Sequence, residues 1–208
     1  MDKEDADMVE RYDQIEYPNG VNRIYRLALV RYLKKRYRIR DYSYMLDVGA
    51  GVSDYWKTFQ TKKILAFPTS YDLEKEWEHD SGSQDYIFCK SVLEHIHDTQ
   101  HFLSEARRVL KYGGEAIFLV PDWESQWNIF YDDSTHVKPF TLKGLEQALK
   151  LAGFSDVRCE HFYQLPFTWK YTKLKWLLYV LRLLPRDTIC STHVRFSRER
   201  MLLCTAMK

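Results

Sequence analysis

The sequence predicts an α/β fold built on a mostly parallel sheet with helices on both faces. Short apolar segments typical of buried strands alternate along the chain with segments whose apolar residues recur at helical spacing. Strands separated by helices pair in parallel, because each helix returns the chain to the end of the sheet where the previous strand began. A length of 208 residues with 45% hydrophobic residues favours a single domain, 1–208, with a large buried core.

The N-terminal part is expected to form an arm followed by a basic helix. The arm covers residues 1–20 and ends at a Pro-Asn-Gly turn signal. The next segment, 21–40, is basic: residues 23–40 contain eight basic and no acidic side chains. An amphipathic helix is predicted over about 21–38 of this segment. The whole chain is nearly neutral, with 31 basic and 29 acidic residues, so no overall charge favours nucleic acid.

The central part, 44–165, supplies most strands and helices of the predicted sheet. Strands are predicted at 44–48, 63–67, 86–89, 116–120, 157–163 and 200–206. Helices are predicted at 53–59, 102–110 and 142–152. Gly113 and Gly114 are expected to end the second helix, and Thr141 and Gly153 to cap the third at its two ends.

An insert, 167–186, separates the last two strands and combines aromatic and leucine residues with basic ones. A helix of this composition at 169–184 is suited to a peripheral position at a membrane surface. The alternative is a helix that packs on the core or on a second subunit of a homodimer. The last part, 187–208, is expected to form the final strand. The longest apolar run, 176–181, is far shorter than the ~20 residues of a membrane-spanning helix.

Four cysteines, at 89, 159, 190 and 204, show no Cys-x-x-Cys pair and no zinc-ligand spacing with histidine. We therefore expect reduced thiols and no metal site. The N-terminus is acidic and has no apolar segment of a signal peptide. Together these features predict a cytoplasmic protein.

A glycine turn follows the first predicted strand in residues 46–51 (LDVGAG). Glycine lets the backbone approach a ligand closely, and the following helix N-terminus favours a negative group. A tight strand-to-helix turn without a ligand is the alternative. A dinucleotide site would need a third glycine where this chain has Asp54, and that carboxylate would repel a pyrophosphate. Hydride transfer is therefore disfavoured.

This turn resembles motif I of the class I S-adenosylmethionine-dependent methyltransferases, and further segments resemble that family in the same order. They are 84–89 (QDYIFC), 92–96 (VLEHI), 106–114 (ARRVLKYGG, with Tyr112 in place of the usual proline) and 151–154 (LAGF). The resemblance covers about 44–165. It implies a Rossmann-like sheet of seven strands with an antiparallel last strand, and S-adenosylmethionine as the cofactor.

The resemblance also implies which residues contact the cofactor. Asp47 would face the ammonium of the methionine moiety, directly or through water, and the turn containing Gly49, Ala50 and Gly51 would pass under the ligand. Two residues after the fourth strand of the family pattern, Cys89 and Lys90, would lie beside the methionine part.

The second strand departs from the family pattern because it ends without the acid that usually binds the ribose hydroxyls. The first acid is Asp72, which lies 21 residues after Gly51. Asp72 is either a displaced ribose ligand or, with Leu73, part of the later segment that meets the adenine. A solvated loop acid is the third interpretation.

The acceptor is expected at the polar loop 132–141 (DDSTHVKPFT), which resembles a loop of small methyltransferases encoded with glycan and lipid-linked sugar biosynthesis. A hydroxyl acceptor must lose its proton, and histidine is suited to take it. His136 is therefore the candidate base, with Asp133 as its catalytic neighbour. A histidine that only braces the loop is the alternative, and His95 is expected to be structural.

Three functions are thus open. The first is methyl transfer to an oxygen, or less favourably a nitrogen, of a sugar, a lipid-linked sugar or another small metabolite. The second is RNA methylation through the basic helix, which is disfavoured because CKSV at 89–92 stands where nucleobase methyltransferases carry NPPY. The third is a binding subunit that has lost turnover, which the unusual end of the second strand suggests.

Overall fold

The computed structural model describes residues 23–50, 59, 63–66, 72–183 and 191–208. Within these ranges, six strands form one sheet in the order β2-β1-β3-β4-β6-β5. The strands are β1 (Tyr44–Val48), β2 (Lys63–Ala66), β3 (Gln84–Lys90), β4 (Leu110–Pro121), β5 (Ser155–Tyr163) and β6 (Arg200–Met207). A seventh strand is not found in this described part of the chain.

The sheet is mixed. Strands β1 to β4 pair in parallel, whereas β6 is antiparallel to both of its neighbours, β4 and β5. The prediction of an antiparallel last strand is therefore confirmed. The carboxyl ends of β1, β2, β3 and β4 all point to one edge of the sheet, which is where ligands bind in open α/β sheets.

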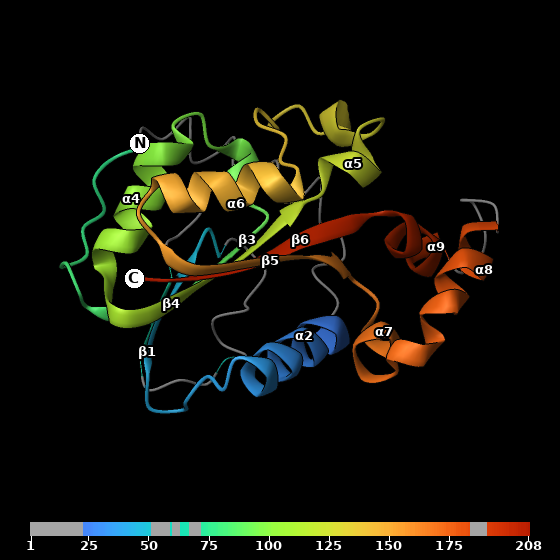
Figure 1. The fold of residues 1–208 in the computed structure, drawn as a ribbon, viewed down its shortest axis with the longest axis horizontal. Coiled ribbons are helices and arrows are strands. Elements are labelled where there is room, and N and C mark those ends of the chain that lie inside the picture. Colours follow the sequence, from blue (N-terminus) through green and yellow to red (C-terminus); the bar gives the residue numbers. More distant parts are fainter. Residues whose placement is uncertain (1–22, 51–58, 60–62, 67–71, 184–190) are drawn as a thin grey trace.

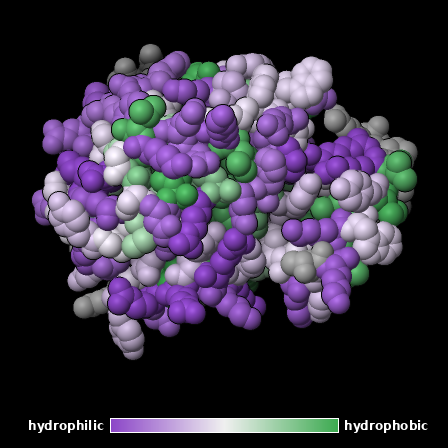
Figure 2. All heavy atoms as spheres, viewed as in Figure 1, coloured by the Kyte–Doolittle hydropathy of each residue, from purple (hydrophilic) through white to green (hydrophobic). Residues whose placement is uncertain are grey.

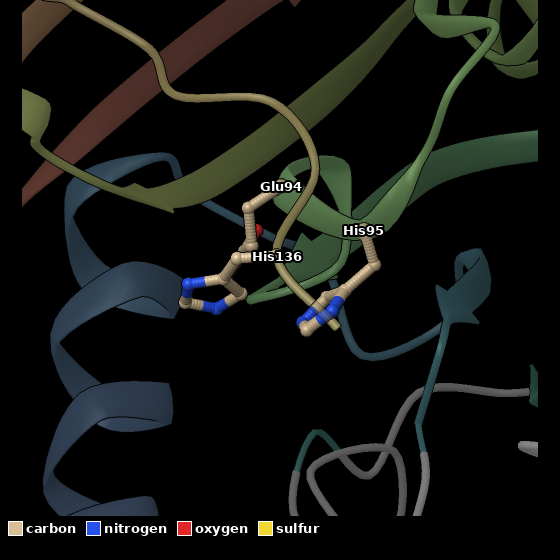
Figure 3. Close-up of side chains that lie close together, drawn as sticks. All are labelled: Glu94, His95 and His136. Atoms are coloured by element: carbon tan, nitrogen blue, oxygen red, sulfur yellow. The ribbon is translucent and has the colours of Figure 1, made fainter. Parts of the chain in front are cut away.

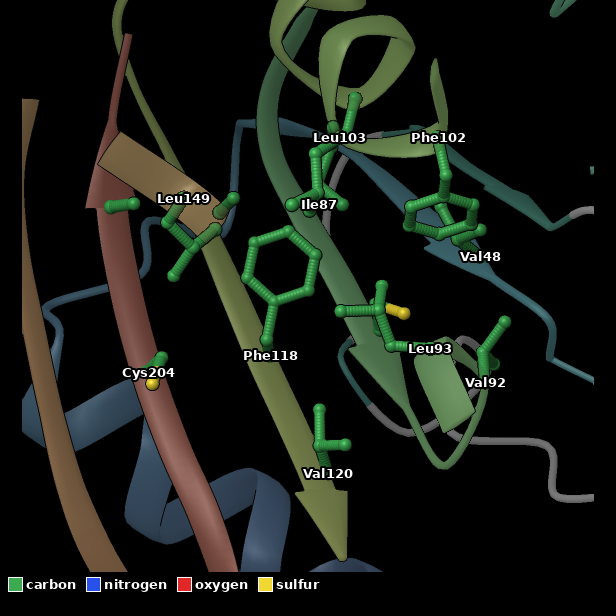
Figure 4. Close-up of a cluster of buried hydrophobic side chains, with 14 of the residues drawn as sticks. Val48, Ile87, Val92, Leu93, Phe102, Leu103, Phe118, Val120, Leu149 and Cys204 are labelled. Atoms are coloured by element: carbon green, nitrogen blue, oxygen red, sulfur yellow. The ribbon is translucent and has the colours of Figure 1, made fainter. Parts of the chain in front are cut away.

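Helices cover both faces of the sheet, as predicted (Figure 1). On one face, α4 (Thr99–Val109) and α6 (Leu142–Leu151) bury apolar side chains against β1, β3, β4 and β6. On the other face, α2 (Arg23–Arg36) packs Leu29, Val30 and Leu33 against the opposite side of the same strands. Figure 4 shows part of the first cluster, where Phe118 of β4 lies among side chains of the neighbouring strands and of α6.

The start of α6 confirms a local prediction. The Thr141 hydroxyl accepts a hydrogen bond from the Gly144 N–H at 3.1 Å, and Gly153 has a φ of +86° just after the helix ends. A hydroxyl at the N-cap satisfies one of the backbone donors that the first helical turn leaves unpaired.

The glycine pair at 113–114 does not end α4, contrary to the prediction. The helix ends at Val109, and β4 begins directly at Leu110 with extended backbone. A Cβ on Gly114 would lie 2.9 Å from the Lys111 carbonyl oxygen and 3.0 Å from that of Asp85. Gly114 therefore permits a close backbone approach within an irregular start of β4, where the pairing with β3 shifts register.

The insert is not one continuous helix. It forms three short elements: α7 (Pro166–Lys170), η4 (Thr172–Trp176) and α8 (Leu177–Leu183). The part 187–208 also contains an unpredicted helix, α9 (Ser191–Arg198), before β6. Strand β6 starts at Arg200, where the last strand was predicted. Helices this short depend on tertiary contacts. Here Arg182 of α8 donates to the Ser197 carbonyl at 2.9 Å, and Arg198 of α9 donates to the Arg182 carbonyl at 2.7 Å.

The expectation of reduced thiols is wrong for one pair of cysteines. Cys159 of β5 and Cys204 of β6 lie opposite each other in the antiparallel register and form a disulfide. They are 45 residues apart in the chain, so their spacing carried no signal of the pairing. Cys89 is a free, buried thiol.

In the ranges that the structure describes, no helix has both the length and the apolar character needed to cross a membrane.

Candidate active site

The glycine turn lies where the carboxyl ends of β1 and β3 meet. Val48 and Cys89 are register partners at this edge, and Gly49 follows with a φ of +69°. A Cβ on Gly49 would lie only 2.3 Å from Cγ2 of Val92, in the segment after β3. Both the left-handed backbone and this contact require glycine at position 49. Gly51 and most of the predicted helix 53–59 lie outside the described residues.

Two predicted cofactor residues beside this turn are buried. Asp47 is 2% exposed and Ala50 is 4% exposed. Asp47 is paired in register with Ala66, the last residue of β2, so it stands at the ligand-binding edge of the sheet. A carboxylate in this position suits a positively charged ligand group.

Cys89 and Lys90 end β3 at the same edge. Burial raises the pKa of the Cys89 thiol well above its usual value, and the nearby carboxyls of Glu94 and Asp47 add to the effect. The neutral form of the thiol is therefore favoured, which makes it unsuited to act as a nucleophile. Burial lowers the pKa of Lys90, whose Nζ lies 3.3 Å from the Ser91 hydroxyl.

Asp72 and Leu73 stand in a turn after β2. Asp72 is exposed, accepts the Glu74 N–H at 3.1 Å and pairs with Lys75 at 3.0 Å. The hydrogen bond from Lys75 holds the pKa of Asp72 below its usual range. Leu73 is half-buried and packs on the apolar cluster that contains Val48. These local contacts do not distinguish the ribose from the adenine interpretation, so the cofactor role of Asp72 stays a prediction.

The acceptor loop is held against η2 (Leu93–His95), the short helix after β3. The N–H groups of Val137 and Lys138 both donate to the Glu94 carbonyl oxygen, at 2.8 and 3.0 Å. This clamp brings the predicted His136 beside His95, with ring centroids 4.8 Å apart (Figure 3). The structure thus joins two segments that are 40 residues apart in the chain.

His136 has one ring nitrogen committed to the loop. Its Nδ1 donates to the Phe130 carbonyl at 2.6 Å, which assigns the proton to Nδ1 and leaves the lone pair on Nε2. Nε2 lies 3.7 Å from Oδ2 of Asp133, and the His136 side chain is 14% exposed. The two residues predicted to be catalytic are therefore neighbours.

His95 is held in a similar way. Its Nδ1 lies 3.2 Å from the Thr135 carbonyl and 2.8 Å from the Thr135 hydroxyl, which in turn donates to Asp133 at 2.6 Å. Burial lowers the pKa of His95, and the neighbouring His136 contributes. The neutral form of His95 is therefore favoured.

Glu94 is a site residue that sequence reasoning missed. It is 1% exposed, and among the residues that the structure describes neither of its carboxylate oxygens has a hydrogen-bond partner. Burial raises the pKa of Glu94 to about 8. An acid within the apolar run of the VLEHI segment was the available signal. The carbonyl oxygen of Glu94 accepts the Val137 and Lys138 N–H groups, so Glu94 lies where the segment after β3 meets the acceptor loop.

The aromatic residues of the acceptor region are divided between packing and exposure. Phe130, in η3 (Phe130–Asp132) after the short α5 (Trp123–Gln126), is buried and lies 4.4 Å from the His136 ring, centroid to centroid. Trp123 packs edge-on against Phe130 at 5.5 Å. Trp127 and Tyr131 are mostly exposed.

The tyrosines of α2 are used for packing. Tyr25, Tyr32 and Tyr37 are half-buried against the apolar cluster beneath the sheet, and Tyr32 lies 5.2 Å from the Trp169 ring, centroid to centroid. Arg36 of the same helix forms an ion pair with Glu160 of β5. These contacts disfavour base stacking by this helix and so disfavour RNA as the substrate.

Comparison with known proteins agrees with this architecture. A model of the methyltransferase-domain family matches residues 21–158. A SAM-dependent methyltransferase from Archaeoglobus fulgidus has a similar structure, with a TM-score of 0.60 and 17% identity, covering 95% of this chain and 98% of that one. No curated protein matches the sequence significantly.

A second similar structure is phosphoethanolamine N-methyltransferase 2 of Haemonchus contortus, with a TM-score of 0.58 and 16% identity. The match covers 86% of this chain and 52% of that chain, so the present sequence spans about half of that protein. At these identities the two structures establish the fold alone, whereas the family model covers more than half of the sequence. The chain therefore belongs to the methyltransferase-domain family, and its cofactor is S-adenosylmethionine.

Proposed function

We propose that this protein, acting as a single domain over 1–208, transfers the methyl group of S-adenosylmethionine to an oxygen of a sugar, a lipid-linked sugar or another small metabolite. The observation that carries the proposal is the clamp between η2 and the acceptor loop. It holds the His136 imidazole beside η2, the short helix that follows the end of β3. We therefore propose that the donor and acceptor sites adjoin at this edge of the sheet.

The donor side is formed by the ends of β1 and β3 and the turn after β2. The proposed cofactor contacts are Asp47, Gly49, Ala50, Gly51, Asp72, Leu73, Cys89 and Lys90. Asp47 would attract the ammonium group, and Gly49 leaves room for the ligand above the turn. The neutral thiol of Cys89 would contact the uncharged part of the methionine chain.

The acceptor side supplies proton transfer. When bound, S-adenosylmethionine would supply its methyl group to the acceptor oxygen and would leave as S-adenosylhomocysteine, with the electron pair of the broken carbon–sulfur bond on sulfur. The hydroxyl proton passes to Nε2 of His136, whose lone pair is available because Nδ1 donates to Phe130. Asp133, 3.7 Å from Nε2, stabilises the resulting imidazolium. A hydroxyl needs such a base, and for this reason we favour oxygen over nitrogen as the acceptor atom.

Cofactor binding tests the donor side. Titration calorimetry of the full chain with S-adenosylmethionine is expected to show binding that Asp47→Asn weakens by about 10- to 100-fold, because one charge-assisted hydrogen bond contributes ~1.5–3 kcal/mol. Asp41→Asn, which alters an exposed acid next to Lys34, is the matched control and should bind like the wild type. Absence of binding by the wild type at millimolar cofactor would refute the proposal.

A lipid-linked acceptor would bring the protein to a membrane surface, and α7, η4 and α8 carry side chains suited to that contact. Exposed apolar residues gather there: Tyr171, Trp176, Tyr179, Val180 and Leu183. Lys170, Lys173 and Lys175 lie among them. Figure 2 shows hydrophobic beside strongly hydrophilic residues over this end of the molecule. We therefore propose peripheral binding of a cytoplasmic protein to anionic lipid.

Vesicle co-sedimentation tests this surface. The wild type is expected to pellet with vesicles containing anionic lipid and to be released by high salt. Trp176→Glu should stay in the supernatant, because a negative charge replaces an aromatic ring of the type that is enriched at membrane interfaces. Tyr112→Glu, at an exposed position outside these helices, is the control. Equal binding by wild type and Trp176→Glu, or a concentration-dependent dimer without vesicle binding, would contradict a membrane role.

A further inference from the structure

Three potential metal ligands converge at the acceptor site. One carboxylate oxygen of Glu94 and one ring nitrogen each of His95 and His136 lie within 4.8 Å of one another (Figure 3). Ligands held ~2.0–2.2 Å from one metal ion lie no more than roughly 4 Å apart. Side-chain adjustments of under roughly one ångström would therefore complete a three-residue metal site.

The burial of Glu94 is a separate observation that points to a cation. This carboxyl is 1% exposed, and no hydrogen-bond partner for either of its oxygens lies in the described part of the chain. A buried polar group without a partner is costly, and buried carboxylates are as a rule paired or metal-bound. A metal ion between Glu94 and the two imidazoles would supply the missing partner.

The histidines are already arranged as metal-binding histidines usually are. Such residues donate the other ring N–H to a carbonyl or carboxylate, which fixes the tautomer and the ring orientation. Nδ1 of His136 bonds the Phe130 carbonyl, and Nδ1 of His95 meets Thr135, whose hydroxyl is in turn bonded to Asp133. Both Nε2 lone pairs are thereby left for a ligand.

A second group of similar composition lacks these properties. Asp122, Glu124 and His161 also lie close enough to share an ion, but Arg200 pairs with Asp122 at 2.6 Å and with Glu124 at 3.4 Å. The guanidinium already neutralises those carboxylates. Because Arg200 neutralises its carboxylates, this group is not expected to bind a metal ion, and it serves as a control for the Glu94 cluster.

We propose that Glu94, His95 and His136 bind a divalent first-row transition-metal ion that holds and activates the acceptor oxygen. Two imidazoles and one carboxylate suit such ions and leave coordination positions open for a substrate oxygen. The ion would act as a Lewis acid that lowers the pKa of the bound hydroxyl, whose proton then passes to Asp133. In this arrangement Nε2 of His136 is a ligand, so Asp133 replaces His136 in the role of base given to it above. The catalytic part rests on the proposed function, whereas metal binding itself does not.

Metal binding by the full chain is the direct test. After chelator treatment and dialysis, Co²⁺ titration followed by visible absorption, with Zn²⁺ competition, is expected to show one equivalent bound. Glu94→Gln and His136→Asn should each weaken binding by at least about 100-fold, because each removes a ligand. His161→Asn should bind like the wild type. Absence of binding in the wild type, or equal binding by all variants, would overturn the proposal.

Folding and cofactor controls keep the result interpretable. Circular dichroism and calorimetry with S-adenosylmethionine should show that Glu94→Gln and His136→Asn remain folded and bind the cofactor. Full methyl transfer in the presence of chelator would overturn the catalytic role of the ion and leave the methyltransferase proposal intact. Metal binding without any cofactor binding would instead refute the proposed function while supporting the metal site.

Discussion

Replacing His136 with alanine is expected to lower kcat for methyl transfer by about 10²–10⁴-fold, which is the usual contribution of a placed acid–base group. The imidazole is the group that the η2 clamp brings to the acceptor edge, with Asp133 3.7 Å from its Nε2. The affinity for S-adenosylmethionine should not change, because the residues proposed to bind it lie on β1, on β3 and in the turns after β1 and β2, and not on the acceptor loop.

A coupled assay of S-adenosylhomocysteine release, with calorimetry of cofactor binding, measures both quantities. The acceptor is chosen by screening sugars and lipid-linked sugars with the wild type. His101→Ala, on α4, is the matched control and should keep the wild-type kcat. If His136→Ala and His101→Ala turn over equally fast, His136 only braces the loop through its bond to Phe130.

The Gly49→Ala variant is expected to lose about 2–5 kcal/mol in the free energy of unfolding. The left-handed backbone costs a residue with a Cβ ~1–2 kcal/mol, and forcing a methyl group into a packed contact costs a further ~1–3 kcal/mol. The new Cβ would lie 2.3 Å from Cγ2 of Val92, which is 7% exposed. A valine branch next to its own backbone has little freedom to move away.

Gly82 provides a matched control because its φ is +67° but no described atom lies within 4 Å of a Cβ built there. Gly82→Ala should therefore lose only the backbone cost, ~1–2 kcal/mol. Urea unfolding of both variants separates the cost of the left-handed backbone from the cost of the contact with Val92. In the Gly49→Ala background, the further substitution Val92→Ala should restore part of the stability. Equal losses at positions 49 and 82 would show that the contact with Val92 is unimportant.

Much of the sheet could be predicted because its central strands are short apolar runs. Residues 44–48 form β1 as predicted, with Met45, Leu46 and Val48 fully buried. A strand buried on both faces needs apolar side chains at nearly every position, and this leaves a signal in the sequence itself. The cap of α6 by Thr141 is equally local, because the hydroxyl and the N–H it binds are three residues apart.

The predictions that proved wrong depended on partners distant in the chain. The glycine pair at 113–114 resembles a helix end in the sequence. In the structure, glycine at position 114 leaves room for the backbone carbonyl of Asp85 on the neighbouring strand. The insert looked like one helix but folds as three short ones, and α8 is tied to α9 by bonds between Arg182 and Ser197 and between Arg198 and Arg182. The disulfide joins positions that only the β5–β6 register brings together.

For the site, the sequence alone determined the methyltransferase family, the glycine turn and the loop containing Asp133 and His136. The residues of each of these motifs are adjacent in the sequence, so the motif can be recognised without knowledge of the tertiary structure. Only the tertiary structure decided that His95 and Glu94 share that site, because the hydrogen bonds of Val137 and Lys138 to the Glu94 carbonyl join segments far apart in the chain. The burial that leaves the Glu94 carboxylate without a partner arises from the same packing of segments, and no local pattern of residues encodes it.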